Sequence, residues 1–344
     1  MNSTASQGRM GVLLLNLGTP AAPTVPAVRR FLAEFLTDRR VIHLPTPLRW
    51  LVVHAGILPF RPRRSARAYA SIWTERGSPL LMHGRDLRDE LSGRLGSSHA
   101  VALGMRYGSP SIAEALQELR AADVDGIAVV PLFPQHDASS SGSAVERALE
   151  SARSVEAPVA RTVGPFFAHP SYIAALSEVA RPHLERFGPD HVLMSYHGLP
   201  VGHVRKADAT GSWCLRTEGC CDSIGPSSRD CYRAQCFATS RALAAALSLS
   251  QEGYTVSFQS RLGPVAWLEP QTDRSLGALA RSGVRRLAVI CPSFVADCLE
   301  TLEEIGIRGR SQWEEAGGEE LLLVPCLNSH PSWVDAMLDL LGVA

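Results

Sequence analysis

A histidine stands at the end of a strongly apolar stretch of this sequence. Residues 191–197 read HVLMSYH, which is typical of a strand buried on both faces. Ligands of open α/β sheets bind beyond the carboxyl ends of the strands, where His197 would lie. Imidazole takes and gives protons near neutral pH. The position of His197 therefore indicates acid–base chemistry, although a histidine that only hydrogen-bonds at a strand end would give the same pattern.

Three carboxylates follow a second apolar run, which ends at Cys291. A helix over Val295–Ile305 would place Asp297, Glu300 and Glu304 on one face, because they are spaced i, i+3 and i+7. A line of carboxylate oxygens suits a hard or borderline divalent cation. Taken alone, the spacing favours the ordinary alternative, a solvated acidic helix face.

Five of the eight cysteines fall in one short segment, as Cys214, Cys220, Cys221, Cys231 and Cys236. The surrounding residues 207–233 are polar and contain glycine, so burial alone would struggle to order them. Thiolate ligation would order them instead, and Zn²⁺ or a 2Fe–2S cluster each needs four thiolates. The spacing is not the paired C-x2-C of a zinc ribbon, which makes zinc the weaker choice.

A serine- and glycine-rich turn follows a third apolar run, within PLFPQHDASSSGS (residues 131–143). Backbone N–H groups and hydroxyls at such a turn, just before a helix, suit an anionic group. The turn lacks the GxGxxG pattern, so a dinucleotide is not indicated. The alternative is an ordinary serine-rich helix N-cap.

The elements that must position these residues alternate along the chain. Eight apolar runs are predicted as strands: 11–17, 101–107, 126–133, 159–164, 191–197, 254–259, 286–291 and 320–325. Helical patterns occupy 111–121, 143–154, 171–187, 236–247, 272–282, 295–305 and 331–341. This alternation predicts parallel sheets with crossover helices, as two four-stranded halves. The boundary is placed at PFFAHP (165–170), and residues 45–78, which lack strand character, are predicted to be a lid or binding element.

Composition limits the class of protein. The 344 residues suit two domains, and 34 basic and 34 acidic residues give no net charge, which does not indicate a nucleic-acid partner. No uncharged apolar run approaches the ~20 residues of a membrane span. Residues 1–10 lack the apolar core of a secretory signal, so a cytoplasmic location and reduced cysteines are expected.

Several of these strings together resemble the ferrochelatase family. They occur in family order across nearly the whole chain: LLLNLGTP (13–20), IW and GSPL (72–80), MRY (105–107), PLFPQHDASSSGS, SYHGLP (195–200), FQSRLGPVAWLEPQT (258–272) and FVADCLETL (294–302). The resemblance implies a lyase that inserts Fe²⁺ into protoporphyrin IX, the terminal step of haem biosynthesis. It also implies two Rossmann-like domains, 1–165 and 166–330, with the porphyrin in the cleft between them and a helix in 331–344 that packs back on the first domain.

The resemblance implies roles for single residues as well. His197 would accept the pyrrole protons, with Glu300 as its acidic partner and Glu304 next on an acidic path; these three would contact the substrate Fe²⁺. Arg308 stands where the path would continue, which departs from the family's pattern and shortens the path. Cys298 stands where the family often has histidine, which argues against a metal-handling role at that position. The expected porphyrin-binding residues are Arg106, Tyr107, Ser139, Ser141, Leu58 and Trp267.

Residues 44–73 resemble the lip of the protoporphyrin-using branch, which covers the pocket and touches membrane. Its apolar residues are Leu51, Val52, Val53, Ile57, Leu58 and Phe60. They fit a peripheral membrane contact, or else a local mini-core.

Some members of the family carry a 2Fe–2S cluster, and the cysteine-rich insertion (about 207–236) resembles one of its forms. The ligands implied are Cys214, Cys221, Cys231 and Cys236, with Cys220 as the alternate, and the role is structural or sensing. Three other functions stay open from the residues. They are a chelatase for another metal or tetrapyrrole, a non-catalytic two-domain haem-binding protein, and a zinc-binding scaffold.

Overall fold

The predicted eight strands are present and form two parallel sheets. The structure is a computed structural model that describes residues 8–261, 263 and 265–343; predictions on residues 1–7, Leu262 and Pro264 lie outside the described residues. The strands are β1 (Met10–Gly18), β2 (His99–Tyr107), β3 (Gly126–Pro131), β4 (Val159–Thr162), β5 (His191–His197), β6 (Tyr254–Gln259), β7 (Arg286–Ile290) and β8 (Glu320–Leu323). Their orders are β2-β1-β3-β4 and β6-β5-β7-β8, with every neighbouring pair parallel. The prediction of two four-stranded parallel sheets flanked by helices is confirmed.

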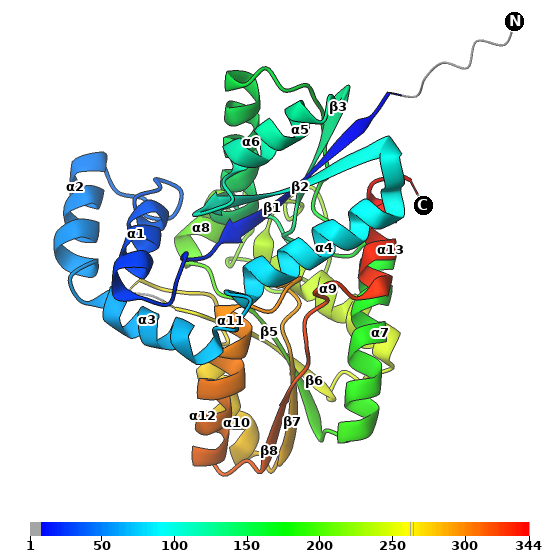
Figure 1. Ribbon diagram of the computed structural model, residues 1–344. Helices are drawn as coiled ribbons and strands as arrows, with labels where there is room; N and C mark the ends of the chain where they lie inside the picture. The colour runs from blue at the N-terminus through cyan, green and yellow to red at the C-terminus, as the bar shows by residue number, and fades with distance from the viewer. Residues whose placement is uncertain (1–7, 262, 264, 344) are drawn as a thin grey trace, which may run out of the picture. The chain divides into compact units, whose positions relative to one another are not determined.

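Helices cover both faces of the first sheet. Residues Leu103 and Gly104 of β2 point to opposite faces, because side chains alternate along a strand. A Cβ on Gly84 of α4 (Pro79–Leu95) would meet the Leu103 side chain, whereas one on Gly104 would meet Ile112 and Ala115 of α5 (Ile112–Ala121). Helices α4 and α5 therefore pack on opposite sides of β2 (Figure 1).

The second sheet is also enclosed. On one face Leu193, Val289 and Leu321 pack against Leu276 of α10 (Thr272–Arg281) and Trp313 of α12 (Arg310–Glu315). Helices α7 (Pro170–Phe187) and α9 (Tyr232–Leu247) lie along the other face (Figure 1). Burial on both faces explains why these strands read as continuous apolar runs in the sequence.

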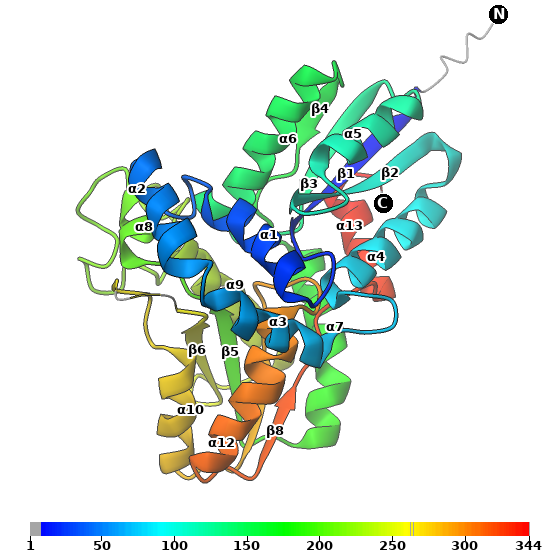
Figure 2. The same ribbon diagram turned by 60° about the vertical axis from the view of Figure 1, so that its left-hand side comes forward.

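The helices differ from the sequence prediction at one place. Residues 45–78 lack strand character, as predicted, and are largely helical, as α2 (Thr46–Leu51), η1 (Val52–Ile57) and α3 (Arg61–Ile72), which lie beside α1 (Val25–Leu36) (Figure 2). The single helix predicted over 295–305 is wrong: the chain turns irregularly as far as Cys298, and only then form α11 (Leu299–Leu302) and the π-helix η4 (Glu304–Gly309). The remaining helices are η2 (Gly96–Ser98), η3 (Ala138–Gly142), α6 (Ser143–Ser154), α8 (Val201–Lys206) and α13 (Pro331–Leu340).

The chain divides into two compact units. One holds the residues up to Leu132, Ala138–Gly164 and those from Met337 onward; the other holds Phe133–Asp137 and Pro165–Ala336. The domain limits at 165 and 330 stay predictions. In the described part of the chain no helix has both the length and the apolar character needed to cross a membrane.

Candidate functional site

His197 ends β5 and is held by three hydrogen bonds. Its backbone N–H donates to Ser293 Oγ at 3.0 Å, and its carbonyl accepts from the Tyr232 hydroxyl at 2.8 Å. The ring Nδ1 lies 2.6 Å from the carbonyl oxygen of Gly198. A carbonyl only accepts, so Nδ1 must carry the hydrogen, and the lone pair of the neutral ring is on Nε2. His197 is half-buried, and Nε2 is the ring nitrogen whose lone pair this hydrogen bond leaves unengaged.

Glu300 is brought to the same end of the same sheet. Gln259, the last residue of β6, pairs with His197 in the strand register. Its side-chain Nε2 donates to the Glu300 carbonyl oxygen at 2.7 Å, while its Oε1 accepts from Ser195 Oγ at 2.7 Å. Gln259 is 4% exposed, so the bridge between β5, β6 and α11 is buried at Ser195 and partly buried at Glu300. The bridge went unnoticed in the sequence, where Gln259 is one polar residue in a strand.

Asp297 does not share a helical face with the two glutamates. Its buried carboxylate accepts from Asn328 Nδ2 at 2.8 Å, from Thr301 Oγ1 at 3.0 Å and from the Cys326 backbone N–H at 3.3–3.4 Å. Its own N–H donates to Asn328 Oδ1 at 2.8 Å. These bonds tie it to the chain that follows β8 and explain why the helix begins only after Cys298. Asp297 is therefore structural.

Glu304 is already occupied by protein donors. Its carboxylate accepts from the backbone N–H of Ser260 at 2.9 Å and from the Ser260 hydroxyl. Arg308 Nε donates to both oxygens of Glu303 at 3.0 Å, and its Nη2 lies 3.9 Å from Glu304. The arginine that interrupts the acidic path in the sequence thus neutralises neighbouring carboxylates.

Arg106 and Tyr107 share a carboxylate in the first unit that the sequence analysis missed. Asp38 Oδ2 accepts from Arg106 Nη2 at 2.5 Å, from the Tyr107 hydroxyl at 2.8 Å and from Ser143 Oγ at 2.8 Å. Burial alone would raise the pKa of Asp38, but hydrogen bonds from the Arg40 N–H, Tyr107 and Ser143 and the charge of Arg106 outweigh it, so that pKa is lowered. Burial raises the pKa of Tyr107.

The other predicted porphyrin contacts occupy different settings. Ser139 and Ser141 lie in η3, the π-helical turn before α6, and Ser141 is buried. Leu58 is 4% exposed, so it packs inside. Trp267 is half-buried, and its backbone pairs with Pro200 in the loop after His197.

All eight cysteines are free and buried. The sulfurs of Cys214 and Cys231 are 3.1 Å apart, and those of Cys220 and Cys221 are 3.8 Å apart. Asp208 holds the start of the segment, since its carboxylate accepts from the N–H groups of Trp213 at 2.7 Å and Cys214 at 2.9 Å. Cys236 lies on α9 and is fully buried.

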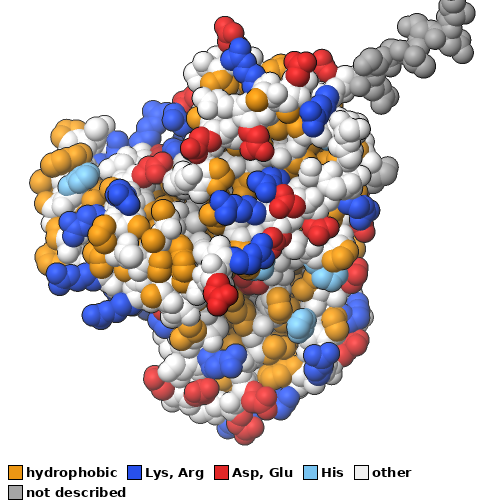
Figure 3. All heavy atoms as spheres, in the orientation of Figure 1, with side chains coloured by type: hydrophobic (Ala, Val, Ile, Leu, Met, Phe, Trp, Pro, Cys, Tyr) orange, Lys and Arg blue, Asp and Glu red, His pale blue; other side chains and the backbone are white. Residues whose placement is uncertain are grey.

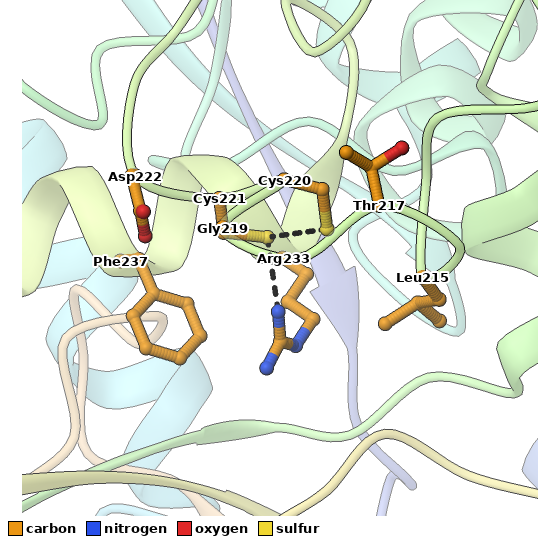
Figure 4. A pocket seen from close by; sticks show the side chains of 8 residues that line it. All are labelled: Leu215, Thr217, Gly219, Cys220, Cys221, Asp222, Arg233 and Phe237. Carbon is orange, nitrogen blue, oxygen red and sulfur yellow. Dashed lines mark hydrogen bonds between the residues drawn. The ribbon is translucent and has the colours of Figure 1, made fainter.

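A pocket of about 320 Å³ opens beside two of these thiols (Figure 4). Arg233 lines it, stacks over Phe237 at 4.7 Å and donates from Nη1 to Cys221 Sγ at 3.1 Å. Its Nε is buried and has no hydrogen-bond partner within the described residues. A guanidinium with a spare buried donor beside clustered thiols suits an anionic, thiolate-bound group.

The thiols do not form a complete ion site as they stand. Across residues 8–261, 263 and 265–343, no three His, Cys, Asp or Glu side chains come together in a way that could hold a metal ion. The same holds for His197, Glu300 and Glu304, the residues expected to contact substrate iron.

Comparisons with known proteins point to one family. The ferrochelatase family model matches residues 9–342. The chain is 48% identical over 332 residues to the ferrochelatase of Coxiella burnetii (strain Dugway 5J108-111), covering 96% of this chain and 93% of that one. It is 47% identical over 331 residues to the ferrochelatase of Legionella pneumophila (strain Corby), covering 96% and 97%. Among solved structures, SirB from Bacillus subtilis with Fe³⁺ matches with a TM-score of 0.50 at 12% identity, over 97% of this chain and 94% of that one; this likeness concerns the fold alone.

Proposed function

Since the chain belongs to the ferrochelatase family, we propose that it makes haem by inserting Fe²⁺ into protoporphyrin, with His197 as the acceptor of the pyrrole protons. A free-base porphyrin carries two inner N–H protons, and both must leave as the metal enters. The observation that supports His197 is its hydrogen bond to Gly198, which leaves the Nε2 lone pair free to take a proton.

Glu300 is proposed as the acidic partner that receives protons from His197. Both residues are held at the carboxyl end of the second sheet, joined through Gln259. The aromatic ring of Phe294 lies 6.3 Å from the His197 ring, which gives the base one apolar neighbour. Glu304 is proposed as a relay to solvent and not as an iron ligand, because each of its oxygens accepts a hydrogen bond from Ser260.

An anaerobic insertion assay tests the function. The protein is mixed with protoporphyrin and Fe²⁺, and the porphyrin absorption bands are followed. His197→Ala is expected to bind porphyrin normally but to lose turnover by roughly 10²–10⁴-fold, the usual contribution of a general base. His191→Ala is the matched control, because His191 begins the same strand and its ring hydrogen-bonds Thr255 at 2.8 Å.

Each failure of this assay has a separate meaning. Tight porphyrin binding without conversion by the wild-type protein would favour a non-catalytic haem-binding protein. Faster insertion of Co²⁺ or Ni²⁺ would favour a chelatase for another metal. Near-normal turnover by His197→Ala would remove His197 from its proposed role.

We also propose that the cysteine segment holds a 2Fe–2S cluster, through Cys214, Cys221, Cys231 and either Cys236 or Cys220. Support comes from the two close sulfur pairs and from the spare Nε–H of Arg233 beside them. Because metal insertion needs no redox change, the cluster would be structural, and its binding free energy would add to folding free energy.

The colour of the anaerobically purified protein tests the cluster. A coloured protein that loses its colour in Cys231→Ser would support the cluster, whereas a colourless protein that binds zinc would refute it. Loss of colour in Cys220→Ser but not in Cys236→Ser would identify the fourth ligand.

The helical arm from α2 to α3 is proposed to touch an anionic membrane surface. Four of its apolar residues are exposed, with exposed fractions of 46% for Leu48, 58% for Trp50, 54% for Leu51 and 77% for Phe60. Exposed arginines lie beside them on α3 (Arg63, Arg64 and Arg67), and Figure 3 shows apolar and basic side chains together on this arm. Val53 and Leu58 instead pack inside, so the mini-core alternative holds for part of the arm.

Vesicle sedimentation tests this contact. Phe60→Ser should lower binding to vesicles that contain phosphatidylglycerol, while Val343→Ser, another exposed apolar residue, should not. Equal binding by both variants would refute the contact. The cytoplasmic location remains a prediction from the sequence.

A further inference from the structure

His197 lies beyond the point where β7 can support β5. The last residues paired between these two strands are Met194 and Ile290, whereas pairing with β6 continues to His197 and Gln259. The N–H and carbonyl of His197 therefore have no ladder partner from β7. Two side chains take the place of the missing strand, since Ser293 accepts from the N–H and Tyr232 donates to the carbonyl.

The two hydroxyl groups therefore hold His197 from both sides of its backbone. Ser293 fixes the peptide before His197, and Tyr232 fixes the peptide after it. The second peptide leads directly to the Gly198 carbonyl that holds ring Nδ1. Rotation of either peptide would turn the imidazole and move Nε2, and a displacement of about 1 Å can cost a large factor in rate.

Tyr232 is itself firmly placed. It is the first residue of α9, 7% exposed, and follows Cys231, the N-cap of that helix. One turn later, Gln235 accepts from the His136 N–H at 2.6 Å and donates to the Arg229 carbonyl at 2.7 Å, which anchors the start of the helix. The hydroxyl of Tyr232 thus connects the end of the cysteine segment to the backbone of His197.

We propose that Tyr232, with Ser293, is a positioning residue that sets the direction of the His197 ring for proton abstraction. This inference rests on the proposed function, because it assumes that His197 is the proton acceptor. Tyr232 need not touch porphyrin for this role. Its loss should therefore slow the chemical step without weakening substrate binding.

The test is Tyr232→Phe, which removes one hydroxyl and keeps the buried ring. The kcat for Fe²⁺ insertion is expected to fall about tenfold, the factor that corresponds to one net hydrogen bond, with the porphyrin KM within about twofold. Ser293→Ala should behave in the same way, and Ser293→Thr, which keeps a hydroxyl, should recover most of the rate.

Tyr196→Phe is the matched control. Its hydroxyl also joins β5 to α9, at 2.7 Å from Ser240, but it does not reach His197. An equal fall in kcat for Tyr196→Phe, an unchanged kcat for Tyr232→Phe, or a rise in KM alone would overturn the positioning role.

If the wild-type enzyme fails to insert iron, or His197→Ala retains turnover, it is the proposed function that fails. If both of those hold and only Tyr232→Phe is normal, this inference alone fails.

Discussion

Replacing Asp38 by asparagine tests the buried network of the first unit. The Asp38 carboxylate is 7% exposed and the Arg106 side chain is 17% exposed, so solvent screens their attraction little. Asparagine keeps the shape of the side chain but loses the charge opposite Arg106. With the amide oxygen in the place of Oδ2, its N–H₂ group faces the Arg40 backbone N–H, which donates to Oδ1 of Asp38 at 2.7 Å. Hydrogen bonds to charged groups contribute about 1.5–3 kcal/mol each, and leaving one partner of a buried ion pair alone costs about 3–5 kcal/mol. We expect a loss of about 2–4 kcal/mol in unfolding free energy at pH 7.

The loss of stability in Asp38→Asn is expected to depend on pH. Because the pKa of Asp38 is lowered in the folded protein, its stabilisation is complete above the unfolded value of about 3.9 and is lost as the pH falls through the folded value. The stability difference between wild type and Asp38→Asn should therefore be largest near neutral pH and shrink below about pH 4. Urea denaturation followed by circular dichroism, repeated from pH 7 downward, measures it.

Asp273→Asn is the control for a lost charge at the surface. Asp273 pairs with Arg261 at 2.6 Å, but the two side chains are 40 and 47% exposed, so the expected loss is below about 0.5 kcal/mol. A variant Asp38→Asn as stable as wild type at pH 7, or a difference that grows as the pH falls, would refute the reasoning.

Two further substitutions follow from the packing. Gly198→Ala would place its methyl group 2.6 Å from the Gln259 carbonyl oxygen, so the backbone next to His197 must shift and kcat in the insertion assay should fall at least tenfold. Gly202→Ala is the control and should leave kcat unchanged, because nothing lies within 4 Å of its methyl group. Equal kcat values for the two variants would show that the backbone at Gly198 shifts without affecting His197. Trp333→Ala should lower the unfolding free energy, measured by urea denaturation, by about 3–5 kcal/mol. Trp333 is fully buried, and its ring centre lies 5.7 Å from that of Phe166 and 6.0 Å from that of Tyr172. A loss under about 1 kcal/mol would mean that neighbouring side chains move in to fill the cavity.

The strands and the position of His197 could be predicted from the sequence alone. Strands buried on both faces, such as β5 and β7, must be apolar at nearly every position, and the helices between them make the sheets parallel. A polar residue at the end of such a strand, like His197, is then placed at the carboxyl edge of the sheet, where open α/β sheets generally bind their ligands. The density of cysteines likewise predicts a thiol-rich segment, within which the sulfurs of Cys214 and Cys231 lie close together.

Only the tertiary structure decided which partners those residues have. The helix predicted over 295–305 was wrong because Asp297 bonds with Asn328, 31 residues later, and no helical period carries that information. Asp38 joins Arg106 across 68 residues, and Tyr232 reaches the His197 carbonyl across 35. The periodicity of apolar residues along one helix or strand predicts which side chains are buried and to which face they point, because both depend on residues only a few positions away. The atoms that orient a catalytic side chain come from whichever elements the fold packs beside it, and their spacing in the chain leaves no periodic signal.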